Sequence, residues 1–408
     1  MDIKYSSSKQ CPCCSLLAQV IIELKKYPLT EFYKEYENND FELDGYLDQE
    51  VCYCEQCNHL FLEKIIDVRE IYTNYLTTTT ASKGAVDCLL NFKKFIDTRL
   101  NINDFKYLID IGGNDSYFLE LFDGTKLSRV NVDANAEGGS SIEVIRSFLE
   151  DIDLAPFSSF KKIIVSSHTI EHLQNPADLI QKIAEVVSGR DQVFLQFPSL
   201  EMIVADARFD QVCHQHLNYF SLASITKLLK THGLSVVDHE YDSSHFGTLR
   251  VMAEKNDVSN KYFLMGSMSA LEIIKQYNDF QNYYFALQNI LSEKLRGQQG
   301  FGAGLMVPTL AYYLPLINDL EDELITANHE QTLNNKTFID PNILSFINNN
   351  NKIIINSTKN DEVILLYKNQ YLYNKYLVDP IIDYFINNNN KIIIDSAIDD
   401  EIILSKKY

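Results

Sequence analysis

The chain has 408 residues, of which 36 are Lys or Arg and 56 are Asp or Glu, so its formal net charge at pH 7 is −20. This charge repels phosphate backbones and no cluster of basic residues compensates for it, so the composition argues against nucleic acid as a partner. No uncharged apolar run is long enough to cross a bilayer, and the first residues lack the pattern of a secretory signal, so we expect a cytoplasmic protein without membrane contact.

The beginning of the chain is rich in cysteine: six of the eight Cys lie within the first 57 residues. In a reducing compartment this crowding favours metal binding over disulfides. Two C-x-x-C motifs supply Cys11, Cys14, Cys54 and Cys57. Two such motifs complete a closed tetrahedral zinc site with no open position. We therefore predict a zinc ribbon with a structural metal over residues 1–75, although Cys13 and Cys52 leave the choice of the four ligands open.

A Gly-rich turn follows the first predicted buried strand. A helix is predicted over residues 87–100 and the strand over residues 106–111, and the turn begins at Gly112 and Gly113. Glycines let the backbone approach a ligand closely, and Asp110 can orient the loop or meet a cationic group. The turn lacks the G-x-G-x-x-G spacing of a dinucleotide site, which disfavours a nicotinamide-dependent dehydrogenase.

A short helix is predicted after the turn, over residues 116–122, and a second strand follows over residues 129–132. That strand ends at Asp133, 23 residues after Asp110. A carboxylate at this place suits the paired hydroxyls of a ribose. The turn and the spaced carboxylate together indicate a cofactor that contains a nucleoside.

Further strands are predicted over residues 162–166, 192–197 and 234–239, with helical segments between most of them. This alternation indicates βαβ units in a mostly parallel sheet, and we expect residues 248–254 to close the sheet as an antiparallel edge strand. The predicted domain covers residues 76–265. Five histidines lie in or near the loops after these strands, where α/β sheets place their ligands: His168, His172, His214, His216 and His245.

The remaining residues, 266–408, predict a smaller Rossmann-like α/β domain. It begins with an amphipathic helix over residues 267–294 and a Gly-rich turn at residues 300–304. Residues 340–355 recur as residues 379–394, at an offset of 39, and each copy reads as helix, Asn-rich turn and buried strand. Two copies are too few for a solenoid, so we interpret them as two successive αβ units.

Together these motifs resemble the three-domain sugar C-methyltransferases, which act on nucleotide-linked deoxysugars, and the resemblance covers essentially the whole chain. It rests on the two C-x-x-C motifs, D-I-G-G-N-D at 110–115, S-H-T-I-E-H at 167–172, F-D-Q-V-C-H-Q-H-L-N-Y-F at 209–220, H-F-G-T-L-R at 245–250 and the turn G-F-G-A at 300–303. The block at 209–220 is the most specific. The resemblance implies an α/β fold with a class I S-adenosylmethionine-dependent methyltransferase sheet in the middle domain. It also implies that the first and third domains close over a nucleotide-linked small molecule.

The resemblance also implies roles for single residues. His216 matches the general base of the family and His172 a supporting His, and His214 is a further catalytic candidate. A base is needed because C-methylation beside a keto group requires an enolate, and His accepts a proton near neutral pH. For S-adenosylmethionine we expect Asp110, Gly112, Gly113, Asn114, Asp115, Asp133 and His168. For the substrate we expect Gln215, Tyr219, His245 and Arg250.

The chain departs from the family pattern at three places. Cys213 and Gln215 stand where the family has Tyr and Glu, and Thr77 or a neighbour stands where it has a further Tyr. Because Gln does not tune the pKa of His216 as Glu would, the acceptor atom stays open between carbon and oxygen. The main expectation is a methyltransferase for a nucleotide-activated sugar or a related capsule precursor. The alternatives are an O-methyltransferase for a non-sugar, phosphate-containing capsule precursor and a catalytically idle binding protein.

Four smaller expectations concern metal binding, Arg250, a second cofactor and the oligomeric state. A metal site made of His214, His216 and His245 has no Asp or Glu at a familiar spacing and is disfavoured. Arg250 suits a substrate phosphate because of its guanidinium fork, but it suits an ion pair at the rim equally well. Residues 326–328 offer no carboxylate where a second dinucleotide site would need one, so we expect no second cofactor there. We expect the protein to be a monomer.

Overall fold

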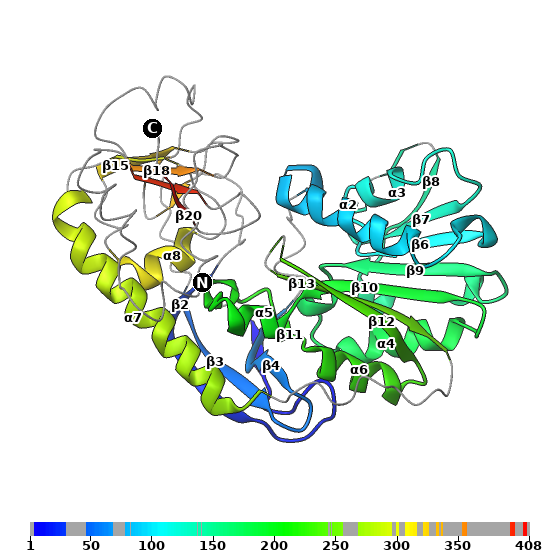
Figure 1. Ribbon diagram of the computed structural model, residues 1–408, viewed down its shortest axis with the longest axis horizontal. Helices are drawn as coiled ribbons and strands as arrows, with labels where there is room; N and C mark the ends of the chain where they lie inside the picture. Colours follow the sequence, from blue (N-terminus) through cyan, green and yellow to red (C-terminus); the bar gives the residue numbers. More distant parts are fainter. Residues whose placement is uncertain are drawn as a thin grey trace.

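The computed structural model describes residues 4–29, 46–67, 78–255 (apart from 82, 137, 140, 244 and 246), 268–295, 299–301 and 307–315, together with short strands from residue 321 onwards. Figure 1 shows a large sheet covered by helices, a smaller N-terminal sheet below it, and the long helix α7 (Ala270–Leu295) beside the smaller sheet. The large sheet and the small sheet meet around residues 199–220, the segment that contains His214 and His216.

The large sheet has seven strands in the order β12-β13-β10-β9-β6-β7-β8. Their bounds are β6 (Tyr107–Ile111), β7 (Ser128–Val132), β8 (Ile142–Ile145), β9 (Lys162–Ser167), β10 (Gln192–Pro198), β12 (Ser235–Asp242) and β13 (Thr248–Glu254). The five neighbouring strands β10, β9, β6, β7 and β8 are parallel to one another, whereas β13 is antiparallel to both of its neighbours, β10 and β12. The predicted α/β fold with a mostly parallel sheet is therefore confirmed.

The prediction that residues 248–254 form the edge strand is wrong. β13 lies inside the sheet, between β10 and β12, and almost all of its residues are buried. β12 forms the edge instead, and most of its residues are only half buried. The two strands are consecutive in the chain and pair as an antiparallel hairpin, so the later and more apolar strand takes the inner position.

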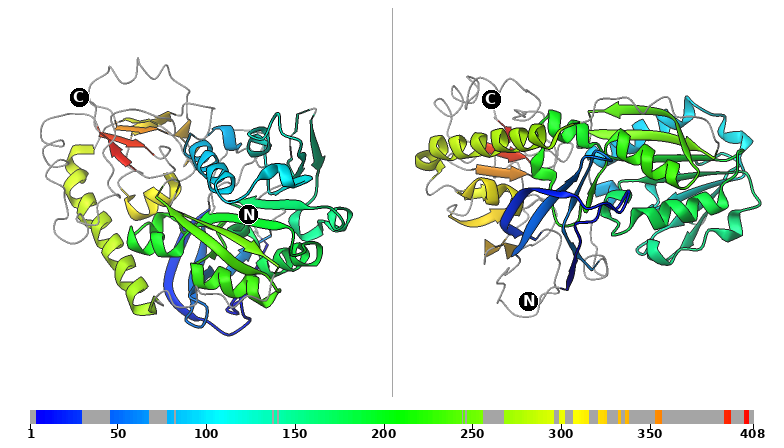
Figure 2. Two further views of the ribbon diagram at one scale, coloured as in Figure 1. Left: turned by 45° about the vertical axis from the view of Figure 1, so that its right-hand side comes forward. Right: turned by 90° about the horizontal axis from the view of Figure 1, so that it is seen from below.

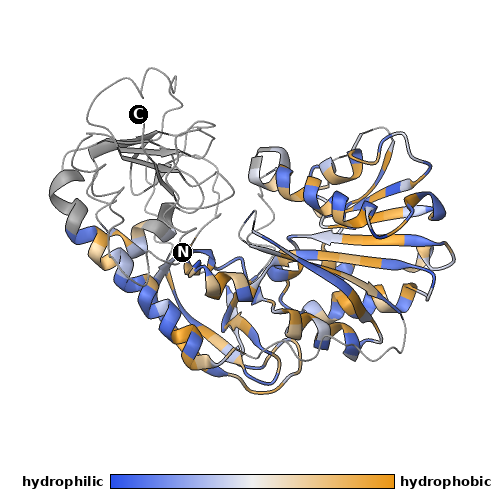
Figure 3. Ribbon diagram, in the orientation of Figure 1, coloured by the Kyte–Doolittle hydropathy of each residue, from blue (hydrophilic) through white to orange (hydrophobic). Residues whose placement is uncertain are grey.

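Helices cover both faces of the large sheet. One face carries α2 (Lys83–Asp97) and α3 (Tyr117–Glu120), and the other carries α4 (Pro176–Val186) and α6 (Leu222–Thr231) (Figure 1). Side chains of a strand point alternately to the two faces: Ile163 belongs to the core under α2, and Ile164 to the core under α4. Both faces are covered, so the central strands β9 and β10 have continuous apolar residues in their middle, as the colouring of Figure 3 shows.

The N-terminal sheet has four strands in the order β11-β4-β3-β2. Their bounds are β2 (Gln19–Pro28), β3 (Tyr46–Cys54), β4 (His59–Leu62) and β11 (Asn218–Tyr219), and a separate pair is formed by β1 (Tyr5–Ser7) and β5 (Lys64–Ile66). β11 comes from the middle of the chain, so the sheet that begins the protein is completed by the segment that follows the predicted catalytic histidine.

Helix α7 confirms the helix predicted over residues 267–294. Together with α8 (Val307–Tyr313) and α5 (Leu200–Ala205), it shares one core with the N-terminal sheet, to which Leu24 and Phe280 both belong. The views of Figure 2 agree with Figure 1 in placing α7 along the blue N-terminal strands. None of the helices that the structure describes is long and apolar enough to cross a membrane.

Six short 3-10 turns connect these elements: η1 (Thr79–Ala81), η2 (Ile102–Asp104), η3 (Leu149–Asp151), η4 (Ala155–Phe157), η5 (Ile170–His172) and η6 (Phe209–Gln211). The helix predicted over residues 116–122 is shorter than expected, because α3 has four residues and begins after a left-handed Ser116. Turn η5 is important for the site, because it directs two side chains of the S-H-T-I-E-H motif.

The strands described in the C-terminal part are β14 (Gln299–Phe301), β15 (Glu321–Ile325), β16 (Thr332–Leu333), β17 (Lys336–Thr337), β18 (Ile353–Asn356), β19 (Ile392–Asp395) and β20 (Ile403–Ser405). β18 and β19 are the strands of the two repeats, and they pair in parallel with Ile353 opposite Ile392, so equivalent positions of the repeats face each other. The predicted helices and Asn-rich turns of the repeats, residues 302–304, residues 326–328 and Thr77 lie outside the described residues.

Candidate active site

The Gly-rich turn after β6 has no room for side chains. Gly112 has a positive φ of 81°, and a Cβ built on it would lie 2.2 Å from Oγ1 of Thr169. A Cβ on Gly113 would lie 2.5 Å from Oδ1 of Asn131. Any side chain at either position would displace these neighbours, and at Gly112 it would also strain the backbone. The turn therefore presents bare backbone at the carboxyl end of β6, where α/β sheets bind their ligands.

Asp110 lies on β6 directly under this turn, and its side chain is buried, with 2% of the residue exposed. Its Oδ1 atom accepts no hydrogen bond from the residues that the structure describes. Burial, reinforced by the nearby Asp133 and Asp115, raises the pKa of Asp110 to about 8. A buried carboxyl that lacks a donor is costly, so the site is suited to a cationic group.

Asp133 and Asp115 fix the shape of the turn. Asp133 accepts hydrogen bonds from the backbone N–H groups of Asn114 at 3.2 Å and Asn135 at 2.7 Å, one on each carboxylate oxygen. Oδ2 of Asp115 accepts both the N–H and the hydroxyl of Thr80, each at 2.9 Å. Each carboxylate oxygen has a second lone pair, so Asp133 keeps the capacity to accept a ligand hydroxyl.

Asn131 is a residue of this site that the sequence analysis missed. It is fully buried in β7, and its amide donates to the backbone oxygen of Asn114 at 3.0 Å and to Oγ of Ser116 at 2.7 Å. Asn114 and Ser116 have left-handed backbones, with φ of 44° and 65°. Asn131 therefore braces the strained part of the turn, and the only signal in the sequence was a polar residue between two valines.

His168 and His245 lie next to each other, although the sequence separates them by a large part of the domain. His168 follows β9 with a left-handed backbone, and its N–H donates to the backbone oxygen of Gln196 at 2.9 Å. Its ring contacts the ring of His245 edge-on, at a centroid distance of 4.5 Å. Its Nδ1 lies 3.3 Å from Oε1 of Glu171, and its Nε2 lies 3.7 Å from Sγ of Cys88.

The structure brings the ring of His172, which belongs to turn η5, into contact with the ring of His216, which lies between η6 and β11. Their ring centroids are 4.9 Å apart and the rings are nearly perpendicular. Nδ1 of His172 donates to the backbone oxygen of Gln215 at 3.1 Å, and burial lowers the pKa of His172 to about 4, so its ring is neutral at pH 7. His216 is half buried and is therefore within reach of a ligand. The predicted base and its predicted support thus form a contacting pair.

The other predicted residues of the 209–220 block lie deeper. Gln215 and Tyr219 are 3% and 1% exposed, and the Tyr219 hydroxyl accepts the N–H of Cys213 at 3.3 Å. The ring centroids of Tyr219 and His216 are 6.4 Å apart, so Tyr219 underlies the predicted base. Roles of Gln215 and Tyr219 in substrate binding stay predictions.

His214 points away from the histidine pair, into the interface with the N-terminal sheet. It is fully buried, with Nδ1 3.4 Å from Nε2 of Gln49 and Nε2 3.4 Å from the backbone oxygen of Tyr27. Burial lowers the pKa of His214 to about 4. These contacts are those of a packed interface residue, and a catalytic role of His214 stays a prediction.

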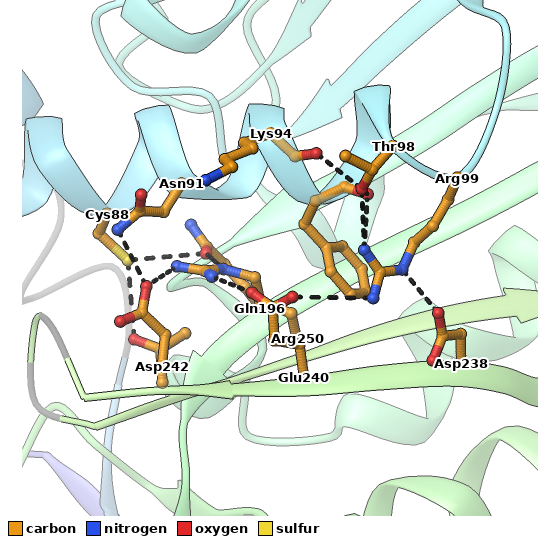
Figure 4. A network of polar contacts seen from close by, with 12 residues as sticks. Cys88, Asn91, Lys94, Thr98, Arg99, Gln196, Asp238, Glu240, Asp242 and Arg250 are labelled. Carbon is orange, nitrogen blue, oxygen red and sulfur yellow. Dashed lines mark hydrogen bonds and ion pairs between the residues drawn. The ribbon is translucent and has the colours of Figure 1, made fainter.

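Arg250 lies on β13 in a buried polar network, which Figure 4 shows. The residue is 1% exposed, and its guanidinium donates to Oε1 of Glu240 at 2.9 Å, to Asp242, and to Oε1 of Gln196 at 3.1 Å. The structure thus shows the ion pair that was the alternative to phosphate binding, but in the interior rather than at a rim. A phosphate would have to displace both carboxylates, so phosphate binding by Arg250 stays a prediction.

Two groups of side chains in the described part of the chain are close enough to hold a metal ion. One consists of Glu171, His172 and His216, and the other of the four cysteines of the C-x-x-C motifs. The disfavoured site of His214, His216 and His245 is not formed, because His214 packs against the N-terminal sheet and His245 against His168.

The four cysteines gather as the spacing predicted: Cys11, Cys14, Cys54 and Cys57. Their sulfur atoms lie within 4.8 Å of one another, and those of Cys14 and Cys54 are 3.7 Å apart. Cys52 is not a member of this group, whereas the thiol of Cys13 forms a hydrogen bond with Cys11 at its border. Four mutually close thiols suit tetrahedral zinc.

The second cysteine motif is tied directly to the strand that follows His216. β4 begins at His59, pairs with β11, and its Leu62 N–H donates to the backbone oxygen of Leu217 at 3.0 Å. Nε2 of His59 lies 3.2 Å from Oδ1 of Asn218, which the sequence analysis did not single out. The amide of Asn218 donates to the backbone oxygen of Leu173 at 2.7 Å, just after η5. The N-terminal segment that contains the four cysteines, residues 4–67, is called the cysteine module below. Through β4 it contacts the segment after His216, and through Asn218 it is linked to the segment after His172.

Comparison with known proteins identifies the central part of the chain. Residues 88–239 match the family described as a methyltransferase domain, and this range begins in α2, contains β6 to β11, and ends in β12. A curated protein, the C-methyltransferase NovU of Streptomyces niveus, is 23% identical over 215 residues. The match covers half of each chain, so the chain spans about half the length of the curated relative it matches.

Solved structures share only part of the molecule. One is a protein of Pyrococcus horikoshii OT3, with a TM-score of 0.38 and 11% identity over 46% of this chain and 99% of that chain. Another is the complex of the Haloferax volcanii Trm112 methyltransferase activator with a methyltransferase, with a TM-score of 0.36 and 15% identity over 42% of this chain and 92% of that chain.

Proposed function

We propose, from the premise that residues 88–239 of this chain are a methyltransferase domain, that the protein methylates a nucleotide-activated sugar or a related polysaccharide precursor with S-adenosylmethionine. One observation carries the proposal. The Gly112–Gly113 turn is bare backbone above the buried carboxyl of Asp110, and the half-buried His216 follows in the same domain. A cofactor site and a base are the two components that such a transfer needs.

The residues of the turn fit this cofactor chemically. S-adenosylmethionine is cationic at its sulfonium and at its α-ammonium, and it carries two ribose hydroxyls. Asp110 offers a buried carboxyl oxygen that lacks a donor, which suits the cation, and Asp133 has lone pairs for the hydroxyls. Asn114, Asp115 and His168 complete the proposed contacts around this turn. When bound, the cofactor supplies an electrophilic methyl group.

In the proposed reaction His216 removes the proton of the acceptor. The ring is half buried, so an acceptor can reach it while much of the surrounding water is excluded. Before the transfer His172 is neutral, and it is oriented by the backbone oxygen of Gln215 and contacts the ring of His216 edge-on. S-adenosylmethionine bound at the Gly-rich turn would supply the methyl carbon for the electron pair left on the acceptor atom.

The motifs along the chain support a nucleotide-linked sugar as the acceptor molecule. The match to a protein named as a C-methyltransferase supports carbon as the acceptor atom. A carbon acceptor needs a neighbouring carbonyl so that its proton can be removed, whereas a hydroxyl acceptor needs less activation. Both acceptors give their proton to His216, so the proposed role of this residue is the same for either.

We assign the four clustered cysteines to a structural zinc ion. Four protein thiolates would take all four positions around a zinc ion, so no position would remain for a substrate. The ion would hold the two cysteine motifs together, and the strand pairing of β4 with β11 transmits this order to the residues after His216.

The proposal is tested in two steps with the full chain. S-adenosylhomocysteine should raise its melting temperature, and the absence of any stabilisation would remove the basis for a methyltransferase. The chain is then incubated with methyl-¹³C-labelled S-adenosylmethionine and a panel of nucleotide sugars that includes 4-keto-deoxysugars. We expect mass spectrometry to show a product heavier by one labelled methylene. The ¹³C chemical shift then distinguishes a methyl group on carbon from one on oxygen, and binding without any product would identify an idle binding protein.

A further inference from the structure

Glu171 is a buried carboxylate that lies between two histidines, His168 and His172, and has no role in the reaction proposed above. It belongs to turn η5, and 1% of the residue is exposed. Its Oε1 atom lies 3.3 Å from Nδ1 of His168 and 3.9 Å from Nε2 of His172. Neither carboxylate oxygen accepts a hydrogen bond from the described residues, and no Lys or Arg among them forms an ion pair with it. A carboxylate held in this way needs positive charge nearby.

The tautomer of His172 shows where that charge can come from. The backbone oxygen of Gln215 only accepts hydrogen bonds, so the proton of the neutral ring lies on Nδ1 of His172. The other nitrogen, Nε2, then presents a lone pair towards the carboxylate of Glu171. Two electron-rich atoms face each other across 3.9 Å, and an additional proton on the histidine pair would turn this contact from repulsive to attractive.

A metal ion is the other cation that could fill this place, but the distances favour a proton. Nitrogen and oxygen ligands of one metal lie about 3.0–3.5 Å apart when each bond is about 2.1 Å long. Glu171 and His172 are wider apart than this, whereas the larger sulfur atoms of Cys14 and Cys54 are only 3.7 Å apart. Glu171 is also closer to His168, which is not a member of the metal-capable group.

We propose that Glu171 is a positioning residue of the proposed methyl transfer, and that its negative charge compensates the positive charge which the His172–His216 pair acquires with the acceptor's proton. This inference rests on the proposed function. The C–H or O–H bond of the acceptor breaks, the proton moves to His216, and the electron pair forms the new bond to the methyl carbon. The sulfur of the bound cofactor would keep the electrons of the bond that breaks, and Glu171 itself forms and breaks no bond.

The groups around the histidine pair determine the direction of the effect. Glu171 raises the proton affinity of the pair, whereas His168 opposes a proton on His172 when it is itself charged. Tyr219 faces His216 from β11 and is kept neutral, because burial raises its pKa far above the usual value. Cys88 and His245 contact His168 rather than the pair. Glu171 is thus the negative charge closest to the pair among the described contacts.

The test is a titration of the full chain with ¹³C-labelled histidine, followed by NMR with and without S-adenosylhomocysteine. In Glu171→Gln we expect the His172–His216 pair to take up its first proton about one pH unit lower than in the parent, because one adjacent negative charge is lost. Glu171→Asp keeps the charge and should titrate close to the parent. The matched control is Glu201→Gln, since Glu201 is a partly buried carboxylate that instead accepts from Leu222 and Ser199.

An unchanged titration in Glu171→Gln would overturn the proposal. So would tight Mn²⁺ binding that broadens the His172 and His216 signals and is lost in Glu171→Gln, because it would assign the group to a metal. If Glu171→Gln does not fold, ¹⁵N NMR of the parent decides instead: the proposal requires the Nδ1–H tautomer of His172, and the opposite tautomer contradicts it. These measurements need no acceptor, so a parent that fails to bind S-adenosylhomocysteine contradicts the proposed function separately.

Discussion

At the scale of single residues, Asp110 links the cofactor proposal to a pH dependence. Its raised pKa of about 8 means that the carboxyl is mostly protonated at pH 7 in the unliganded chain. The α-ammonium of S-adenosylhomocysteine favours the ionised form of Asp110, so binding has to release this proton. We expect the affinity for S-adenosylhomocysteine to rise with pH up to about 8, by at most about tenfold per unit, and then to level off. Calorimetry in buffers of different ionisation enthalpy measures the released proton directly.

Asp110→Asn is the matched variant for this experiment. The amide has nearly the same shape but cannot ionise, so we expect weaker binding without the rise between pH 6 and 8. Proton release that persists in Asp110→Asn would show that another group titrates on binding, and it would separate Asp110 from the cofactor.

His216 allows a second prediction at this scale. Replacing it with Ala removes the proposed base, so methyl transfer should fall by about 10²- to 10⁴-fold, while affinity for S-adenosylhomocysteine stays close to that of the parent. His239→Ala is the control, because His239 lies on the edge strand β12 and contacts Tyr241 rather than the pair. Product formation at the parental rate in His216→Ala would mean that a different group removes the proton.

The residues of the site could be predicted unevenly. Gly112, Gly113, Asp110 and Asp133 follow from strand ends and spacing, because parallel strands place their carboxyl ends at one edge. Asn131 and Glu171 did not stand out, since their importance depends on burial and on partners far along the chain. The sequence alone shows neither the burial of a residue nor its distant partners, and a single polar residue in an apolar segment has many explanations.

At the scale of elements, the pairing of β4 with β11 connects the cysteine module to the histidine pair. Removing zinc with a chelator should disorder β4, because a module of this size has little core of its own. We expect methyl transfer to be lost while binding of S-adenosylhomocysteine largely remains, since the Gly-rich turn follows β6 in the large sheet, whereas β4 pairs with the strand after His216. Isothermal calorimetry and a transfer assay on the same sample measure both properties. Equal loss of both would show that the module supports the whole domain.

Asn218→Ala tests the same connection without touching a cysteine. The variant keeps the four thiols but loses the contact with His59 and the hydrogen bond to Leu173. We expect unchanged zinc content and a transfer rate at least about tenfold lower, because the loss of buried hydrogen bonds allows the two histidine segments to separate. Full activity in Asn218→Ala would show that contacts other than those of Asn218 hold His172 and His216 together.

Five of the seven strands of the large sheet, β6, β7, β9, β10 and β13, were predicted within one residue, because buried strands produce apolar runs. β12 extends three residues beyond its predicted end, and β8 was not predicted. The wrong position of β13 has a clear cause: sequence gives the order of strands along the chain, whereas a hairpin reverses which of two consecutive strands is outermost. β11 has two residues and so no periodicity that could be recognised. Pairing with a strand far back in the chain is a property of the folded state alone.

At the scale of the whole molecule, the N-terminal sheet, α5 and α7 share one core that crosses the predicted domain boundaries. An isolated segment of residues 78–255 would leave Ile203, Val204 and Phe209 without their covering partners. We therefore expect this segment to be much less stable than the full chain, and to aggregate on heating, because a contiguous apolar surface becomes exposed. A cooperative unfolding transition of the segment at the temperature of the full chain would contradict this expectation.

The contact of His59 with Asn218 spans 159 residues of chain. A ribosome that adds about 5–20 residues per second needs roughly 8–30 s to make the intervening segment. During this interval the newly made β4 has an unpaired side, which is open to strands of other nascent chains. Zinc uptake at Cys11 to Cys57 does not have to wait for β11, so early metal loading would protect the growing polypeptide before its partner strand emerges. A shortage of the metal during translation would then lower the yield of the protein more than a shortage after its release.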